Sequence, residues 1–162
     1  MHWAFGLPFL GLLFDFLDGK VARLTKNGPS LLGQELDSLS DLISFGVAPA
    51  ILGYVVGLRT RLDTLILAFF VCAGLARLAR FNVTTHVIPQ DENGKAKYFD
   101  GLPIPTSLFL VALLWYAFQY NHLNQVMVIL TLYKNTKVHL FSFAYLGWAF
   151  AMVSKTLKIP KL

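Results

Sequence analysis

Five long apolar runs constrain the fold of this chain more than any other feature of its sequence. They cover approximately residues 2–17, 36–58, 62–78, 104–120 and 138–153, and the first can continue as helix to Leu24. Each run is close to the roughly 17–25 residues that a helix needs to cross a bilayer. The sequence therefore predicts an all-α fold, a polytopic transmembrane helical bundle with about five spans. Residues 1–162 are expected to form a single membrane domain.

The composition supports a membrane protein and argues against several other classes. Hydrophobic residues make up 56% of the chain and charged residues 14%, whereas a soluble domain carries about 25% charged residues. The single cysteine, Cys72, excludes an intramolecular disulfide and a metal–thiolate cluster. The net charge of +5 would suit a nucleic-acid partner. On so apolar a chain, however, cations that flank membrane spans explain it better. We therefore expect contact with membrane lipids and no nucleic acid.

The lysines and arginines divide unequally between the two ends of the predicted spans. If the spans alternate in direction, one side receives only Arg59, Arg61, Lys134 and Lys137, and the other side receives ten cations. Because cytoplasmic loops carry an excess of cations, the ten-cation side is predicted to face the cytoplasm, with the segment between the first two spans. The first apolar run begins almost at Met1, so the odd number of spans also suggests that a preceding helix is missing.

Four aspartates interrupt this apolar chain around the junction of the first two predicted helices. Asp15 and Asp18 are three residues apart, so they share one face of a helix. Asp37 and Asp41 are four residues apart and follow Gly33 on a single stripe. The residues Asn-Gly-Pro at 27–29 indicate a turn between the two helices. We therefore predict two antiparallel helices whose four carboxylates face one cavity near the membrane surface.

The energetic cost of these carboxylates indicates that they bind cations. A carboxylate at the centre of a bilayer costs about 2.5–3.5 kcal/mol, and four together would repel one another. An ordinary helix end, neutralised by Lys20, Arg23 and Lys26, is the alternative, but it does not explain the shared-face spacings. Ligand sets made only of oxygen suit Mg²⁺ or Mn²⁺. Two such ions would neutralise all four charges.

Small residues beside the aspartates leave room for a ligand. Gly19, Ala22 and Gly33 lie next to the carboxylates, and Arg23 is a fixed cation able to hold phosphate oxygens. Small residues also mediate close helix packing in membranes, which is the alternative interpretation. Together with Arg23, however, they favour a pocket for a metal ion and a phosphate.

These residues carry a resemblance to a known family. The pattern Asp15-x-x-Asp18-Gly19-x-x-Ala22-Arg23, followed by Gly33-x-x-x-Asp37-x-x-x-Asp41, resembles the signature of the CDP-alcohol phosphatidyltransferases. The stretches "QELDSLSDLISFGVAPA", "CAGLARLARFNV" and "KYFDGLPIPTS" resemble the branch of that family that uses serine as the alcohol. The tail "MVSKTLKIPKL" is similar to the fungal, endoplasmic-reticulum form of that branch.

The resemblance implies an activity and a role for each motif residue. It implies transfer of a phosphatidyl group from CDP-diacylglycerol to L-serine with release of CMP, in a six-span core whose first helix is absent here. The four aspartates would hold two Mg²⁺ or Mn²⁺ ions, and Asp41 would also accept the proton of the attacking alcohol. The residues expected to contact CDP-diacylglycerol are Gly19, Ala22, Arg23, Ser30 and Gly33. A homodimer in the endoplasmic-reticulum membrane, with its active site facing the cytoplasm, is also implied.

Recognition of serine rests on a weaker pattern. Arg77 and Arg80 are three residues apart and are followed by Phe81 and Asn82, so these four residues could meet the carboxylate of serine and its surroundings. Anchoring at the membrane flank is the alternative. Two other functions also remain open. One is a sibling enzyme that uses inositol or glycerol phosphate. The other is a cation transporter, which the apolar sequence "FGVAPAILGYVVG" after the aspartates disfavours. The four histidines lack metal-ligand spacing and are assigned no role.

Overall fold

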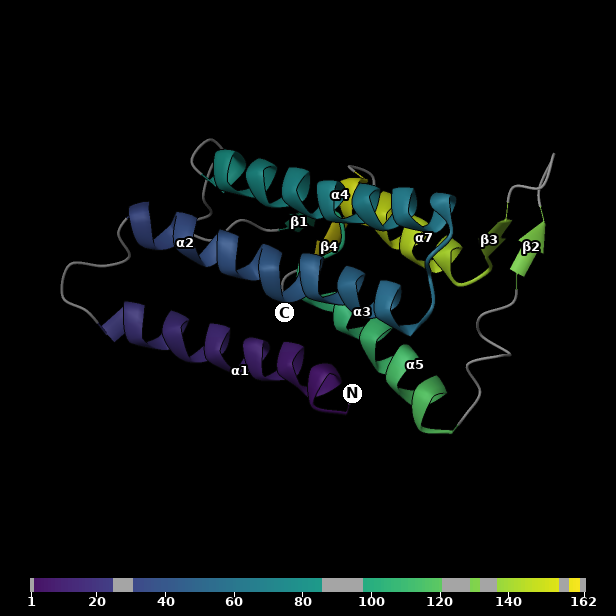
Figure 1. Cartoon of the computed structure of the whole chain (residues 1–162). Helices are drawn as coiled ribbons and strands as arrows, with labels where there is room; N and C mark the ends of the chain where they lie inside the picture. Colours follow the sequence, from purple (N-terminus) through teal and green to yellow (C-terminus); the bar gives the residue numbers. More distant parts are fainter. Residues whose placement is uncertain are drawn as a thin grey trace.

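The computed structural model describes residues 2–24, 31–85, 98–120, 129–131, 137–154 and 158–160, and it confirms the predicted helical fold (Figure 1). The helical segments are α1 (His2–Leu24), α2 (Leu31–Asp41) continued by η1 (Leu42–Val47) and α3 (Ala48–Val56), α4 (Arg61–Thr85), η2 (Ile104–Ser107) continued by α5 (Leu108–Gln119), and α7 (Ser142–Val153). Each of the five predicted apolar runs therefore forms helix over most of its length.

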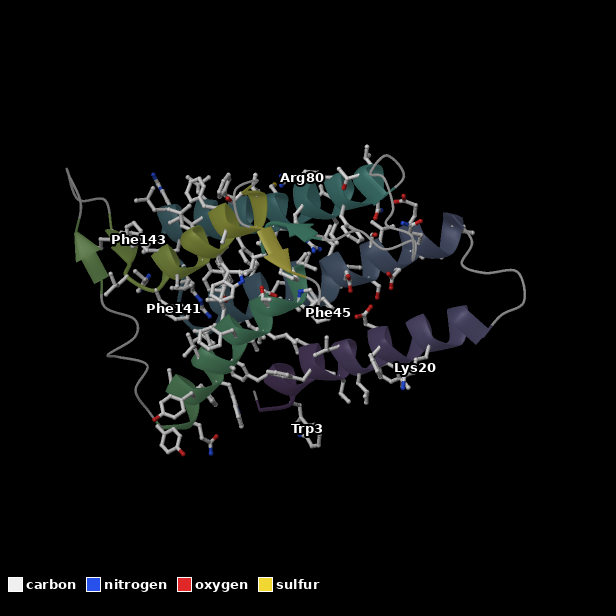
Figure 2. The ribbon with its side chains drawn as sticks, turned by 180° about the vertical axis from the view of Figure 1, so that it is seen from behind. Trp3, Lys20, Phe45, Arg80, Phe141 and Phe143 are labelled. Atoms are coloured by element: carbon white, nitrogen blue, oxygen red, sulfur yellow. The ribbon has the colours of Figure 1, made fainter. Side chains whose placement is uncertain are left out.

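Length and composition fit a membrane bundle. In the described part of the chain, the helical segments Leu32–Val56 and Arg61–Thr84 are long and apolar enough to cross a membrane. Shorter apolar helices cover Trp3–Leu17, Ile104–Gln119 and Ser142–Val153. Large apolar side chains of α1 face outward, among them Trp3, which is 88% exposed and points away from the bundle in Figure 2. Such a surface suits lipid better than water.

The fifth run begins its helix later than the sequence predicts. Its first residues belong to strand β3 (Lys137–His139), which pairs antiparallel with β2 (Ile129–Thr131), and α7 begins only at Ser142. The backbone N–H of His139 donates to the Asp63 carboxylate at 3.0 Å, so this segment is tied to α4 in an extended form. A second antiparallel pair joins β1 (Tyr98–Asp100) to β4 (Lys158–Pro160). Neither pair was predicted, because such short strands depend on distant partners.

The core lies where α4 packs along α7 and against α3. Tyr145 of α7 is fully buried, and its hydroxyl donates to the carbonyl of Pro49 at 2.7 Å. Its ring meets Phe70 edge-on, with 5.2 Å between the ring centroids. A Cβ at Gly53 would lie 3.0 Å from the Tyr145 hydroxyl oxygen, so only a glycine leaves this side chain its full space. The tyrosine thus joins α7 to both α3 and α4.

The helix that carries Asp41 changes form immediately after that residue. η1 is π-helical, a wider form that often occurs near functional sites. Pro49 has no N–H, so the carbonyl of Phe45, four residues earlier, cannot receive its usual helical hydrogen bond. The fully buried Ser107 of η2 donates its hydroxyl to that carbonyl instead, at 2.5 Å. η2 therefore supports the widened segment that follows the aspartates.

The loop after β1 docks on the end of α7 through a glycine. Gly101 has a φ of +81°, in the left-handed region that favours glycine. A Cβ at this position would collide with the carbonyl oxygen of Met152. The next residue, Leu102, donates its backbone N–H to the carbonyl of Ala151 at 3.1 Å. The conformation at Gly101 therefore brings the loop and the C-terminal end of α7 together.

Candidate functional site

The two helices that carry the aspartates run antiparallel (Figure 1), and α1 contacts η1 and α3, which continue α2. A Cβ at Gly11 of α1 would lie 3.1 Å from the Ser44 hydroxyl oxygen of η1. Asp15 lies one turn beyond Gly11, and Asp41 lies about one turn before Ser44. Because the helices are antiparallel, Asp15 and Asp41 are placed at similar levels along the bundle. Asp37 follows one turn further along the same face of α2.

The described carboxylates do not by themselves complete a metal site. Among the described residues, no group of three or more His, Cys, Asp or Glu side chains lies close enough to hold a metal ion. Asp15 and Asp41 are half-buried and Asp37 is exposed. Asp18 lies on α1, but its side chain is outside the described residues. The predicted four-aspartate site thus stays a prediction, with a donor set of carboxylate oxygens that suits a hard divalent cation.

The residues predicted to contact CDP-diacylglycerol are described only in part. Gly19 of α1 is half-buried and Gly33 of α2 is exposed. A Cβ at Gly19 would have no heavy atom within 4 Å, so space is open there in the described structure. Ala22 and Arg23 lie within α1, but their side chains are outside the described residues, as is the whole of Ser30.

Arg77 links the predicted serine site to the aspartates. It is only 8% exposed, and its guanidinium lies 5.5 Å from the centroid of the Phe81 ring. The guanidinium is attracted electrostatically by the Asp41 carboxylate and repelled by the guanidinium of Arg80. A buried cation on α4 is therefore placed near the residue that was predicted to act as the base. Simple anchoring at a membrane flank would not require this burial.

Arg80 lies on α4 beside the C-terminal end of α7 (Figure 2). One terminal nitrogen, Nη2, donates to the carbonyl of Val153 at 2.9 Å. The other, Nη1, is buried and has no hydrogen-bond partner within the part of the chain that the structure describes. A buried donor without a partner is costly, because its hydration is lost and nothing replaces it. An anion would satisfy it.

Asn82 joins α4 to α2 in a contact that the sequence did not predict. Its amide nitrogen donates to the Ser38 hydroxyl at 3.0 Å and to the Glu35 carboxylate at 3.3 Å. Ser38 directly follows Asp37 in the sequence. The amino-acid sequence contained no signal for this pairing, because Asn82 and Ser38 are 44 positions apart.

A second buried polar cluster lies near the other end of α4. Asp63 is fully buried, and its Oδ1 accepts bonds from the His139 backbone N–H at 3.0 Å and from the Ser142 hydroxyl at 2.6 Å. Its Oδ2 lies 2.5 Å from Nδ1 of the His139 ring. Thr60 and Asp63 also bond each other's backbone N–H, which is a capping box at the start of α4. His139 thus has a structural role, although the sequence analysis assigned it none. The spacing Thr-x-x-Asp could have indicated the cap.

This second cluster does not form a hydrolase triad. Ser142 donates to Asp63 rather than to His139, so the chain from nucleophile to base that such a triad needs is absent from these described contacts. The cluster instead joins the start of α4 to the start of α7.

Comparison with known proteins identifies the family. The family model described as CDP-alcohol phosphatidyltransferase matches residues 1–153. This chain belongs to the CDP-alcohol phosphatidyltransferase family. The family is membrane-bound, in agreement with the apolar helices, and its members generally depend on divalent metal ions. No solved structure matches the chain.

Curated relatives within the CDP-alcohol phosphatidyltransferase family have related names. A Saccharomyces cerevisiae protein named CDP-diacylglycerol–serine O-phosphatidyltransferase is 50% identical over 94% of this chain and 56% of its own length. A Bacillus subtilis protein of the same name is 37% identical over 75% of this chain and 63% of its own length. An archaetidylserine synthase from Methanothermobacter thermautotrophicus is 40% identical over 76% of this chain and 51% of its own length. The chain thus spans about half the length of these relatives.

Proposed function

We propose that this chain is a phosphatidylserine synthase, which transfers the phosphatidyl group from CDP-diacylglycerol to L-serine and releases CMP. The observation that carries the proposal is the 50% identity to the yeast enzyme of that name over 94% of this chain. The geometry supports it, because the buried Arg77 on α4 interacts with Asp41 on α2. A cationic group next to a carboxylate base suits an amino-acid substrate that carries its own carboxylate.

In this proposal Asp41 accepts the proton of the serine hydroxyl. The serine oxygen then forms a bond to the phosphorus that carries diacylglycerol. The bond from that phosphorus to the CMP oxygen breaks, and its electron pair leaves with CMP. Asp15, Asp18, Asp37 and Asp41 would hold the two Mg²⁺ or Mn²⁺ ions. When bound, such ions offset the charge on the pyrophosphate and on the departing CMP.

The substrate contacts in the proposal follow the family motif. Gly19, Arg23 and Ser30 would contact CDP-diacylglycerol, with Ala22 and Gly33 lining its nucleotide. Among the described residues the space beside Gly19 is open, which supports this placement, since a larger side chain there would occupy the volume that a ligand needs.

The serine carboxylate would be bound by the two arginines of α4, with Phe81 and Asn82 nearby. The buried Nη1 of Arg80, which has no partner among the described residues, is the donor best suited to this carboxylate. We further propose a multi-pass location in the endoplasmic-reticulum membrane with the site facing the cytoplasm. The homodimer that the family resemblance implies also remains a prediction.

The choice of alcohol can be tested with purified protein in detergent. We expect conversion of CDP-diacylglycerol and radiolabelled serine to phosphatidylserine only when Mg²⁺ or Mn²⁺ is present, and loss of the product when the metal is chelated. Release of CMP should depend on serine and should not occur with inositol or glycerol phosphate. Turnover with one of those alcohols in place of serine would identify a sibling enzyme. Absence of CMP release with every alcohol would contradict a transferase function.

Replacing either arginine of α4 by glutamine tests the proposed serine contacts. Hydrogen bonds to charged groups contribute about 1.5–3 kcal/mol, so we expect Arg77→Gln and Arg80→Gln each to raise the KM for serine about 10- to 100-fold. The KM for CDP-diacylglycerol should change little. Arg59→Gln is the matched control, because Arg59 is exposed and bonds the carbonyls of Tyr54 and Val55 at the end of α3. An unchanged serine KM in both variants would remove the arginines from this role.

A further inference from the structure

The described side-chain hydrogen bonds that join α2 to α4 converge on Asn82. The amide nitrogen of Asn82 lies 3.0 Å from the Ser38 hydroxyl oxygen and 3.3 Å from Oε1 of Glu35. Ser38 and Glu35 are three residues apart, so both side chains lie on the face of α2 that meets α4. Asn82 and Ser38 are half-buried and Glu35 is exposed, so the contact reaches from the bundle interior to its surface.

The donors in this contact are already in use. The Ser38 hydroxyl has one hydrogen, which it can donate to the carbonyl of Gln34 at 3.1 Å or to Oδ1 of Asn82 at 3.3 Å, and its oxygen can accept from the Asn82 amide nitrogen. An asparagine amide has two N–H donors, and the bonds to Ser38 and Glu35 occupy both. Asn82 could therefore donate to the carboxylate of a bound serine only by releasing α2.

The contact also lies close to the residues of the proposed site. Ser38 directly follows Asp37 and precedes Asp41 by one turn. On α4, Asn82 follows Arg77 and Arg80, and Arg77 interacts electrostatically with Asp41. The bond between Asn82 and Ser38 therefore joins α2 to α4 close to the aspartates of α2 and the arginines of α4. A misplacement of about 1 Å can cost on the order of 100-fold in rate.

We propose that Asn82 is a positioning residue, whose amide holds α2 against α4 so that Asp41 and the arginines keep their spacing. Its part in catalysis rests on the proposed phosphatidyl transfer, whereas the bridge between the two helices does not. Asn82 on this account acts through Ser38 and Glu35, and the serine carboxylate is left to the two arginines.

A charge-exchange pair of variants tests the bridge. Asn82→Asp replaces both N–H donors by a carboxylate facing Glu35, so we expect the thermal unfolding midpoint in detergent to fall by about 2–4 °C. We also expect kcat to fall at least tenfold while the KM for serine stays within about twofold. In the double variant with Glu35→Gln, the new amide can donate to the new carboxylate. This double variant should recover most of the midpoint and of kcat.

The control and the contrary outcomes separate this proposal from the proposed function. Ser40→Ala changes an exposed serine of the same helix and should leave the midpoint and the kinetics unchanged. If the change in unfolding midpoint of the double variant equals the sum of the changes caused by each substitution alone, positions 35 and 82 are not coupled. That result would overturn the bridge, whatever the activity. A serine KM raised tenfold by Asn82→Asp and not rescued by Glu35→Gln would make Asn82 a substrate ligand instead. If the two substitutions are coupled in the unfolding midpoint but the protein has no transferase activity, the bridge is supported and only the proposed function is contradicted.

Discussion

Replacing Asp41 by asparagine is expected to abolish phosphatidyl transfer while leaving the binding of CDP-diacylglycerol measurable. An amide cannot accept the proton of the serine hydroxyl at neutral pH, and a positioned general base contributes about 10²- to 10⁴-fold to a rate. The same change removes one of the four proposed carboxylate ligands, so the loss should lie at or beyond the upper end of that range. Arg77 would lose its anionic neighbour as well.

The measurement has two parts, so that loss of chemistry is distinguished from loss of binding. Turnover is followed as serine-dependent release of CMP, and binding is followed with radiolabelled CDP-diacylglycerol in detergent. Asp91→Asn is the matched control, because it neutralises an aspartate of the polar sequence 86–97, outside the motif that carries the four aspartates. We expect turnover of that variant to match the unmodified protein. Turnover of Asp41→Asn at the same level would remove Asp41 from the role of base.

Replacing Asp63 by alanine is expected to have the largest effect on stability. The carboxylate is fully buried and accepts bonds from the backbones of Thr60 and His139 and from the Ser142 hydroxyl, with the His139 imidazole at its second oxygen. Alanine would leave the buried His139 and Ser142 without their partner and would remove the acceptor of the half-buried Thr60 N–H. Breaking such a buried charged network costs about 3–5 kcal/mol. Asparagine should cost less, because its carbonyl oxygen can still accept hydrogen bonds. Its NH₂ group would face the remaining donors and could not accept from them, so part of the loss should persist.

Thermal unfolding in detergent measures this effect through intrinsic tryptophan fluorescence. A loss of this size should lower the unfolding midpoint by about 10 °C. Arg61→Ala is the control, because Arg61 lies on the same turn of α4 but is exposed. An Asp63→Ala protein that unfolds at the temperature of the control would show that the cluster contributes little. The cluster would then be only a consequence of the packing between α4 and α7.

The helices and the aspartate stripes could be predicted from the sequence because both are local features. The first three apolar runs become α1, the α2 to α3 segment and α4, and the last two of these helical segments are long and apolar enough to cross a membrane. The four-residue spacing of Asp37 and Asp41 places them on one face as soon as α2 forms. The start of the fifth helix was predicted too early, since apolar character alone does not distinguish a strand residue such as Val138 from a helical one.

The π-helical segment after Asp41 could be anticipated only in part. Pro49 indicates that a helical hydrogen bond must be missing four residues earlier, at the carbonyl of Phe45. Nothing local indicates that the hydroxyl of Ser107, 62 positions later, satisfies that carbonyl. The same holds for Tyr145, whose hydroxyl reaches the carbonyl of Pro49 from α7.

The order of the residues along the chain was enough to determine that this protein is helical and apolar, and that four of its nine acidic residues lie in two stripes on successive helices. These properties depend on periods of three or four residues, which each helix expresses by itself. The tertiary structure alone decided that Asn82 bonds to Ser38 and that Asp63 bonds to His139, pairs 44 and 76 positions apart. Which polar groups meet at such separations depends on how the helices pack together, because each buried donor must find an acceptor that its own helix does not supply.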